Sequence, residues 1–122
     1  MQLSFNNNWS VGRFGEQIVE KDCWRRGWRV LDRNWHYGKY GELDIVANDG
    51  KQIVFIEVKT RTSVNYGYPV EAINKSKRNK LRVLANAWLH ENGKVHFPYR
   101  IDSFSVLIDN NNLKIDHLRA VA

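Results

Sequence analysis

The sequence has few of the residues and motifs that identify many protein classes. Its one cysteine, Cys23, excludes an internal disulfide and a cysteine-based zinc cluster. No apolar run approaches the roughly 20 residues of a membrane-spanning helix, and the polar residues 1–8 lack the apolar segment of a signal peptide. Walker-type phosphate loops, dinucleotide fingerprints and the Gly-x-Ser-x-Gly motif of hydrolases are also missing. We therefore predict a cytoplasmic protein without a membrane partner.

Basic residues outnumber acidic residues. The chain of 122 residues carries 19 Lys and Arg against 13 Asp and Glu, which gives a formal net charge of +6 and a pI of about 9.6. Such a balance favours polyanionic partners, most simply nucleic acid. The length fits one domain. We predict a flexible N-terminal arm over residues 1–9 and a single domain over residues 10–122.

Hydrophobic periodicity predicts two helices and five strands. The helices are expected over residues 10–26, with Ser10 as a possible cap, and from a cap at Ser76 to Gly93. The strands are expected over residues 28–37, 41–47, 52–60, 100–108 and 113–118. The resulting order, α-β-β-β-α-β-β, is typical of an α/β domain with a mixed β-sheet flanked by helices.

An Asp-Gly pair separates two of these strands and favours a two-residue hairpin turn. If Asn48 pairs with Lys51, Glu42 lies opposite Glu57, and Asp44 lies diagonal to Glu57. Because side chains alternate along a strand, one face mixes charged and apolar residues: Glu42, Asp44, Val46, Ile53, Phe55, Glu57 and Lys59. The other face is entirely apolar and is expected to pack against helices: Leu43, Ile45, Ala47, Val54, Ile56 and Val58.

The acids on the mixed face suggest a divalent metal site. Magnesium or manganese binds oxygen ligands, and magnesium typically takes one or two carboxylates together with water and substrate phosphates. Asp44 and Glu57 meet that need, with the carbonyl of Val58 as a further ligand. Lys59, on the same face, could position an attacking water or stabilise developing phosphate charge. The alternative is a solvated strand face whose charges have no joint role.

Three further groups are candidates for the same function. Glu16, on the first helix, is either a helix-surface acid or an additional acid that lines the metal pocket. The start of the second helix is basic and could bind phosphate, although it could also serve only solubility. The loop after the second hairpin strand has residues suited to nucleic-acid contact or to a plain connection. The predicted nucleic-acid-binding residues of these two segments are Arg61, Tyr66, Lys75, Lys77, Arg78 and Lys80.

The sequence resembles two groupings of proteins. Asp44 followed by Glu57-Val58-Lys59 resembles the PD-(D/E)xK nuclease signature of restriction-endonuclease-like and Holliday-junction-resolvase-like proteins, with Leu43 in place of the proline. More closely, the chain resembles the YraN family of small bacterial proteins in four segments: Gly15-Glu16, Gly41–Ala47, Phe55–Arg61 and Pro69–Ile73. The resemblance covers residues 11–118 and implies a restriction-endonuclease-like fold with its active site on the central hairpin.

The same resemblance implies roles for individual residues. Asp44 and Glu57 would be metal ligands, Lys59 the catalytic lysine, and Glu16 the additional helix acid of resolvase-like members. We therefore expect a divalent-metal-dependent endonuclease that hydrolyses phosphodiester bonds of DNA, including branched or damaged structures, and that could act as a homodimer. Two alternatives remain open: a non-catalytic nucleic-acid-binding module on the same fold, and an interaction partner in a larger assembly.

Overall fold

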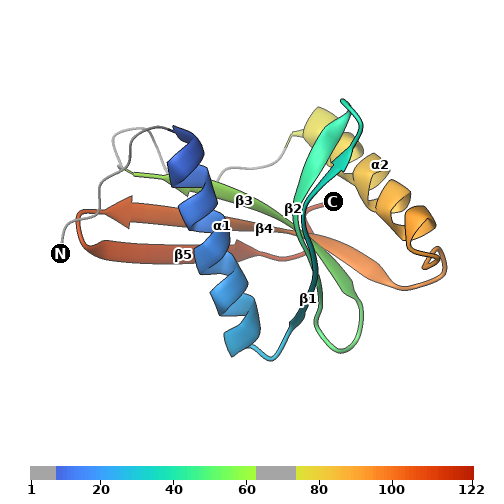
Figure 1. The fold of residues 1–122 in the computed structure, drawn as a ribbon, viewed down its shortest axis with the longest axis horizontal. Coiled ribbons are helices and arrows are strands. Elements are labelled where there is room, and N and C mark those ends of the chain that lie inside the picture. Colours follow the sequence, from blue (N-terminus) through green and yellow to red (C-terminus); the bar gives the residue numbers. More distant parts are fainter. Residues whose placement is uncertain (1–7, 63–73) are drawn as a thin grey trace.

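The computed structural model describes residues 8–62 and 74–122 and has the predicted order of elements (Figure 1). These elements are α1 (Asn8–Arg25), β1 (Arg29–Tyr37), β2 (Gly41–Asn48), β3 (Ile53–Arg61), α2 (Lys75–Glu91), β4 (Tyr99–Asp109) and β5 (Asn112–Leu118). Residues 1–7 of the predicted N-terminal arm lie outside the described residues, and its last two positions belong to α1. Neither described helix is long and apolar enough to cross a membrane.

The five strands form one mixed sheet in the order β1-β2-β3-β4-β5. β3 and β4 are parallel, and the other neighbouring pairs are antiparallel. A parallel pair needs a crossover connection, and α2 lies within the connection between β3 and β4. The predicted α/β architecture is therefore confirmed, and β2 and β3, the strands of the predicted hairpin, lie inside the sheet rather than at its edge.

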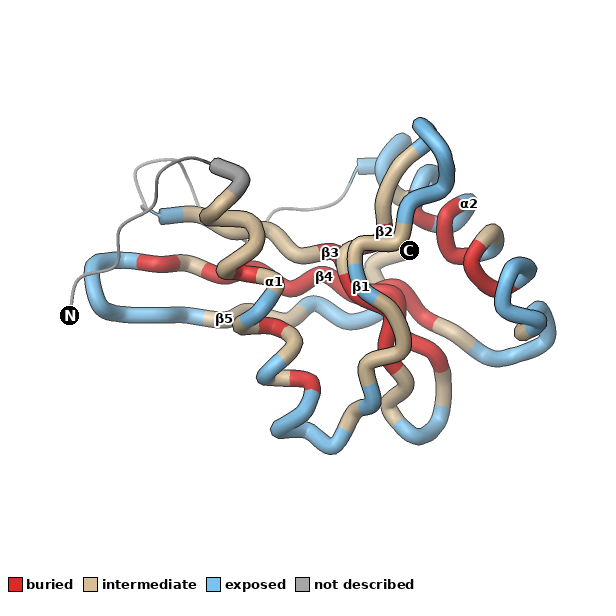
Figure 2. Tube along the Cα trace, in the orientation of Figure 1, coloured by how far each residue is buried: buried red, intermediate tan, exposed pale blue. Residues whose placement is uncertain are grey.

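Each helix packs on its own apolar cluster. Figure 2 shows that the buried residues are concentrated in the strands and in parts of the two helices. The α1 cluster contains Val19 and Cys23 of the helix and Ile45, Ala47, Val54 and Ile56 of the hairpin. The α2 cluster contains Leu84 and Trp88 of the helix together with Val46, Ile53 and Phe55. The apolar hairpin face therefore packs on a helix as predicted. Leu43 is an exception, because it joins the α2 cluster instead.

The hairpin register differs from the prediction by two residues. Asn48 pairs with Ile53 rather than with Lys51, so the connection has four residues. The carboxylate of Asp49 explains the longer turn, because its Oδ1 accepts hydrogen bonds from the backbone N–H groups of Lys51 and Gln52. A shift of two residues preserves the faces of both strands. The predicted pairing of Glu42 with Glu57 is wrong, yet Asp44 and Glu57 still reach a common pocket.

Both predicted helix caps are also wrong. α1 begins at Asn8 rather than at Ser10, and the cap of α2 is Asn74 rather than Ser76. The Asn74 side chain accepts a hydrogen bond from the N–H of Lys77 at 2.8 Å, which leaves Ser76 inside the first turn. The predicted end at Gly93 is confirmed: this residue follows the C-cap and has a φ of 65°, a conformation that favours glycine.

Candidate active site

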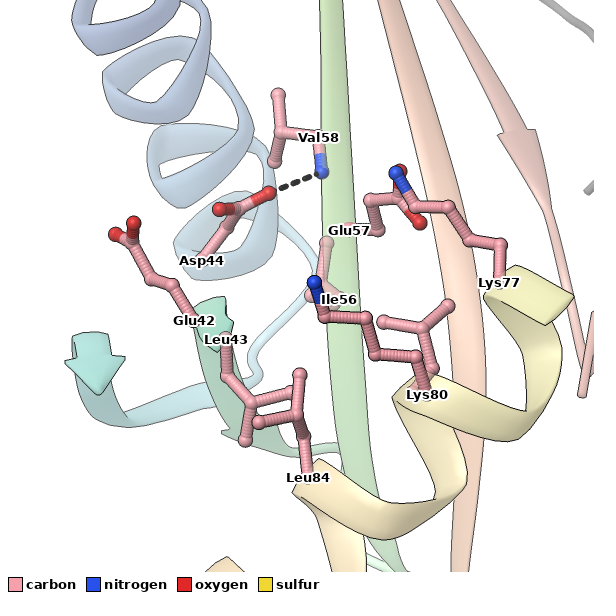
Figure 3. A pocket seen from close by; sticks show the side chains of 10 residues that line it. Glu42, Leu43, Asp44, Ile56, Glu57, Val58, Lys77, Lys80 and Leu84 are labelled. Carbon is pink, nitrogen blue, oxygen red and sulfur yellow. Dashed lines mark hydrogen bonds and ion pairs between the residues drawn. The ribbon is translucent and has the colours of Figure 1, made fainter. Parts of the chain in front are cut away.

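A pocket of about 280 Å³ lies between the β2–β3 hairpin and the start of α2 (Figure 3). Asp44 and Glu57 both line it, and two lysines of α2, Lys77 and Lys80, extend into it from the helix. The remaining lining residues are mostly apolar: Glu42, Leu43, Ile56, Val58, Leu81 and Leu84. The structure therefore brings together the two predicted metal ligands and two of the predicted phosphate-binding lysines.

Glu57 is buried, and only one of its two carboxylate oxygens has a polar partner among the described residues. Its side chain is 9% exposed, and one carboxylate oxygen, Oε1, lies 2.6 Å from the ammonium nitrogen of Lys77. The other oxygen, Oε2, is buried and has no hydrogen-bond partner among the described residues. A buried carboxylate oxygen without a partner is costly. A bound cation would satisfy it.

Asp44 is held in an environment that opposes its charge. Burial, together with the nearby carboxylates Glu16, Glu42 and Glu57, raises the pKa of Asp44 to about 7. One contact acts in the opposite direction, because the backbone N–H of Val58 donates to Asp44 Oδ2 at 2.8 Å. Such a concentration of negative charge around a half-buried acid favours a cation at this point.

Glu16 reaches Asp44 from the other side of the hairpin. It lines a second pocket of about 250 Å³, which shares Asp44 with the first pocket but not Glu57. Close packing of α1 on the sheet holds Glu16 there: a Cβ atom at Gly15 would lie 1.9 Å from Thr60 Oγ1 of β3. Glu16 is therefore beside the predicted metal ligand, in an adjoining pocket.

Asn34 connects two of these acids and was missed by the sequence analysis. Its side-chain amide donates to Glu16 Oε1 at 2.9 Å and to Glu42 Oε1 at 2.8 Å, and its carbonyl oxygen accepts a hydrogen bond from Arg13. Asn34 has a φ of 47°, which asparagine tolerates better than most residues. An asparagine in the middle of a predicted strand was the one available signal.

The residues present fit a divalent cation with two protein carboxylates. Among the residues that the structure describes, no three Asp, Glu, His or Cys side chains are grouped so as to enclose a metal. A cation bound to Asp44 and Glu57 would therefore complete its coordination with water and substrate oxygens, which is the usual arrangement for magnesium. The contact found for Val58 is made by its N–H, so its predicted role as a carbonyl ligand stays a prediction.

A family model, the uncharacterised protein family UPF0102, matches residues 15–106. The chain belongs to the UPF0102 family. This confirms the resemblance to the YraN family, which is the same grouping. Similar UPF0102 proteins include one from Renibacterium salmoninarum, 41% identical over 91% of this chain and 94% of the relative. Another, from Carboxydothermus hydrogenoformans, is 32% identical over 94% of this chain and 97% of the relative.

A solved structure supports the fold of this UPF0102 protein. It is similar to Archaeoglobus fulgidus Hjc, a Holliday junction resolvase from an archaeal hyperthermophile, with a TM-score of 0.50 and 20% sequence identity. The match covers 88% of this chain and 73% of Hjc. At this identity the comparison establishes a shared fold, which is the predicted restriction-endonuclease-like architecture.

The remaining predicted site residues that the structure of the UPF0102 protein describes do not line the first pocket. Lys59 is half-buried on β3 and lines neither pocket. Lys75 is exposed and Arg78 half-buried in the first turn of α2. Arg61 is still part of β3 rather than of a loop. Tyr66 lies outside the described residues.

Proposed function

We propose that this UPF0102 protein is a divalent-metal-dependent endonuclease that hydrolyses phosphodiester bonds of DNA, including branched or damaged structures. The observation that carries the proposal is the shared pocket of Asp44 and Glu57, in which a buried Glu57 oxygen lacks a partner among the described residues. The nuclease-type fold agrees with this function. Magnesium or manganese, when bound, would supply Lewis acidity and an activated water for the hydrolysis.

Some residues of the site would bind the cation, and others would bind the DNA. Asp44 and Glu57 would bind the cation, and Glu16 would add negative charge beside Asp44. Lys59, two residues after Glu57 on β3, is proposed as the catalytic lysine. Lys77 and Lys80 already line the pocket and could contact the phosphate there.

The basic start of α2 would bind the DNA backbone. No acid lies in its first turn, and helix N-termini favour anions through their free N–H groups. Lys75, Arg78, Arg61 and Tyr66 are proposed as further contacts to the DNA backbone. Because such contacts go to phosphates, we expect little base specificity and a steep loss of affinity with increasing salt. A homodimer, by which two strands could be cut together, is proposed as the active form.

The test is cleavage of a labelled panel of single strand, duplex, flap and four-way junction. Each DNA is incubated with magnesium, with manganese and with a chelator, beside Asp44→Ala protein. We expect cleavage that requires metal and is lost in the variant, with the preferred DNA identifying the substrate. Absence of cleavage of every DNA under every condition, or equal cleavage by Asp44→Ala protein, would contradict the proposal. Light scattering of the same sample measures the oligomeric state.

One observation favours a second candidate function, a non-catalytic nucleic-acid-binding module. The ammonium group of Lys77 already lies against Glu57, so one carboxylate oxygen of the proposed metal ligand is engaged by a protein cation. A module of this kind would bind DNA without a metal. Calorimetric titration with manganese distinguishes the two functions, because a pure binding module needs no metal site at Asp44 and Glu57.

A further inference from the structure

The turn between β1 and β2 carries a group of aromatic side chains beside the proposed active site. Trp35 and Tyr37 are stacked, with ring centroids 5.9 Å apart and an angle of 8° between the ring planes. Tyr40 meets Tyr37 edge-on, with centroids 6.1 Å apart. Tyr37 and Tyr40 are 47% and 45% exposed, unlike the aromatic residues of the core. We call Tyr37 and Tyr40 the tyrosine pair.

The backbone of the turn fixes the two rings at an exposed position. The N–H of Tyr40 donates to the carbonyl of Tyr37 at 3.0 Å, and Gly38 between them has a φ of 53°. Figure 2 shows this tip of the β1–β2 hairpin as an exposed projection. Trp35 supports the pair from below, because it packs against the α2 cluster and its indole N–H donates to Glu91 at 2.7 Å. The rings are therefore presented on a supported surface.

Lys80 joins the tyrosine pair to the active-site pocket. Its ammonium nitrogen lies 5.8 Å from the centre of the Tyr40 ring, and the same side chain lines the pocket with Asp44 and Glu57. Lys39, exposed within the turn, adds a second positive charge. Aromatic faces next to lysines at the rim of a phosphate-binding pocket match the chemistry of a nucleotide, in which a planar base is attached to a charged backbone.

We propose that the tyrosine pair is a stacking platform for an unpaired nucleobase of the DNA strand whose phosphate enters the pocket. In a duplex, the faces of the bases are covered by their neighbours, so an unpaired base offers the ring face that stacking requires. The inference rests on the proposed nuclease function and specifies its substrate class: DNA with unpaired bases next to the cleaved bond. It adds two residues with a role in substrate preference, neither of which lines the pocket of Asp44 and Glu57.

The test measures DNA binding by fluorescence anisotropy in the presence of a chelator, so that no cleavage occurs. Wild-type protein is compared with Tyr37→Ala/Tyr40→Ala and with the control Tyr37→Phe/Tyr40→Phe, which keeps both rings. Each protein is titrated against a single strand and the corresponding duplex. Stacking of one base on an aromatic side chain corresponds to about a 5-fold or greater effect on affinity. We expect that loss for the alanine variant on the single strand, less than about a twofold change on the duplex, and near-wild-type affinity for the phenylalanine variant.

A second measurement leaves the protein unchanged and so does not depend on the folding of the variant. Wild-type protein is titrated against the single strand with its bases replaced by abasic sites. We expect it to bind this strand about as weakly as the alanine variant binds the normal strand. An equal loss on single strand and duplex, or no effect of removing the bases, would overturn the stacking platform.

The failure of the inference can be distinguished from the failure of the proposed function. Lys75→Ala should weaken binding to single strand and duplex alike, because phosphates are present in both. If this variant lowers affinity while the tyrosine variants and abasic DNA have no effect, the stacking platform is wrong and DNA binding stands. If wild-type protein binds no DNA at low salt, both are wrong.

Discussion

Replacement of Asp44 by asparagine should make the metal-free protein more stable at alkaline pH. Burial raises the pKa of Asp44 in the folded state from 3.8 to about 7. Between these values the folded protein binds more protons than the unfolded chain, so stability falls as pH rises from about 4 and has fully lost this contribution above about 7. One pKa unit corresponds to about 1.4 kcal/mol, which gives a penalty of roughly 4 kcal/mol at pH 8.5.

Asp44→Asn removes this penalty because the amide is never ionised. Its carbonyl oxygen can still accept the hydrogen bond of Val58. We expect Asp44→Asn to raise the free energy of unfolding by about 2–4 kcal/mol at pH 8.5, and by less than about 1 kcal/mol at pH 4. For a chain of this size the gain corresponds to a melting temperature higher by roughly 10 °C.

The assay is urea unfolding followed by circular dichroism in the presence of a chelator, at several pH values between 4 and 8.5. Asp109→Asn is the matched control, because it removes the same charge from an exposed position at the end of β4. A wild-type protein whose stability does not fall with pH, or an Asp44→Asn variant no more stable than the control at pH 8.5, would refute the charge environment described for Asp44.

Three further predictions concern residues that hold the site and the sheet together. Gly15→Ala should cost about 1–3 kcal/mol in urea unfolding, because its Cβ would overlap a side chain of β3, whereas Gly12→Ala in the same helix has open space and should gain up to about 1 kcal/mol. Equal effects of the two would contradict the close approach of α1. Asn34→Asp should cost about 1–3 kcal/mol at pH 8, and less at pH 4, because it replaces a shared amide donor with a third carboxylate. A pH-independent cost would argue against that contact. Asp102→Asn should cost about 3–5 kcal/mol, since this fully buried carboxylate accepts from Arg100, and the Asp109→Asn protein should show no such loss.

The fold, and the meeting of Asp44 and Glu57 in one pocket, could be predicted from the sequence because both depend on local patterns. Alternation along β2 and β3 assigns each side chain to a face, and a register error of two residues left that assignment intact for the apolar face except at Leu43. The error itself came from Asp49. Its side chain organises a longer turn and also bonds Arg100 of β4 at 2.7 Å, a tertiary contact that the local sequence does not reveal.

The parts of the site that were missed depend on how distant elements pack. Lys77 and Glu57 are 20 positions apart in the sequence and meet because α2 returns across the hairpin. Asn34 meets Glu16 and Glu42 through the packing of α1 on β1 and β2. The tyrosine pair becomes a candidate binding site only because Lys80 lies next to Tyr40. The local sequence pattern does not reveal any of these contacts.

The most direct test of the proposed site is manganese binding by isothermal titration calorimetry at pH 8.5. Wild-type protein, Asp44→Asn, Glu57→Gln and Asp109→Asn are titrated under identical conditions. We predict one bound ion per chain in the wild-type protein and in Asp109→Asn, and loss of that binding in both of the other variants, because a single cation needs both carboxylates. No binding by the wild-type protein, or unchanged binding in Asp44→Asn and Glu57→Gln, would contradict a metal shared by Asp44 and Glu57.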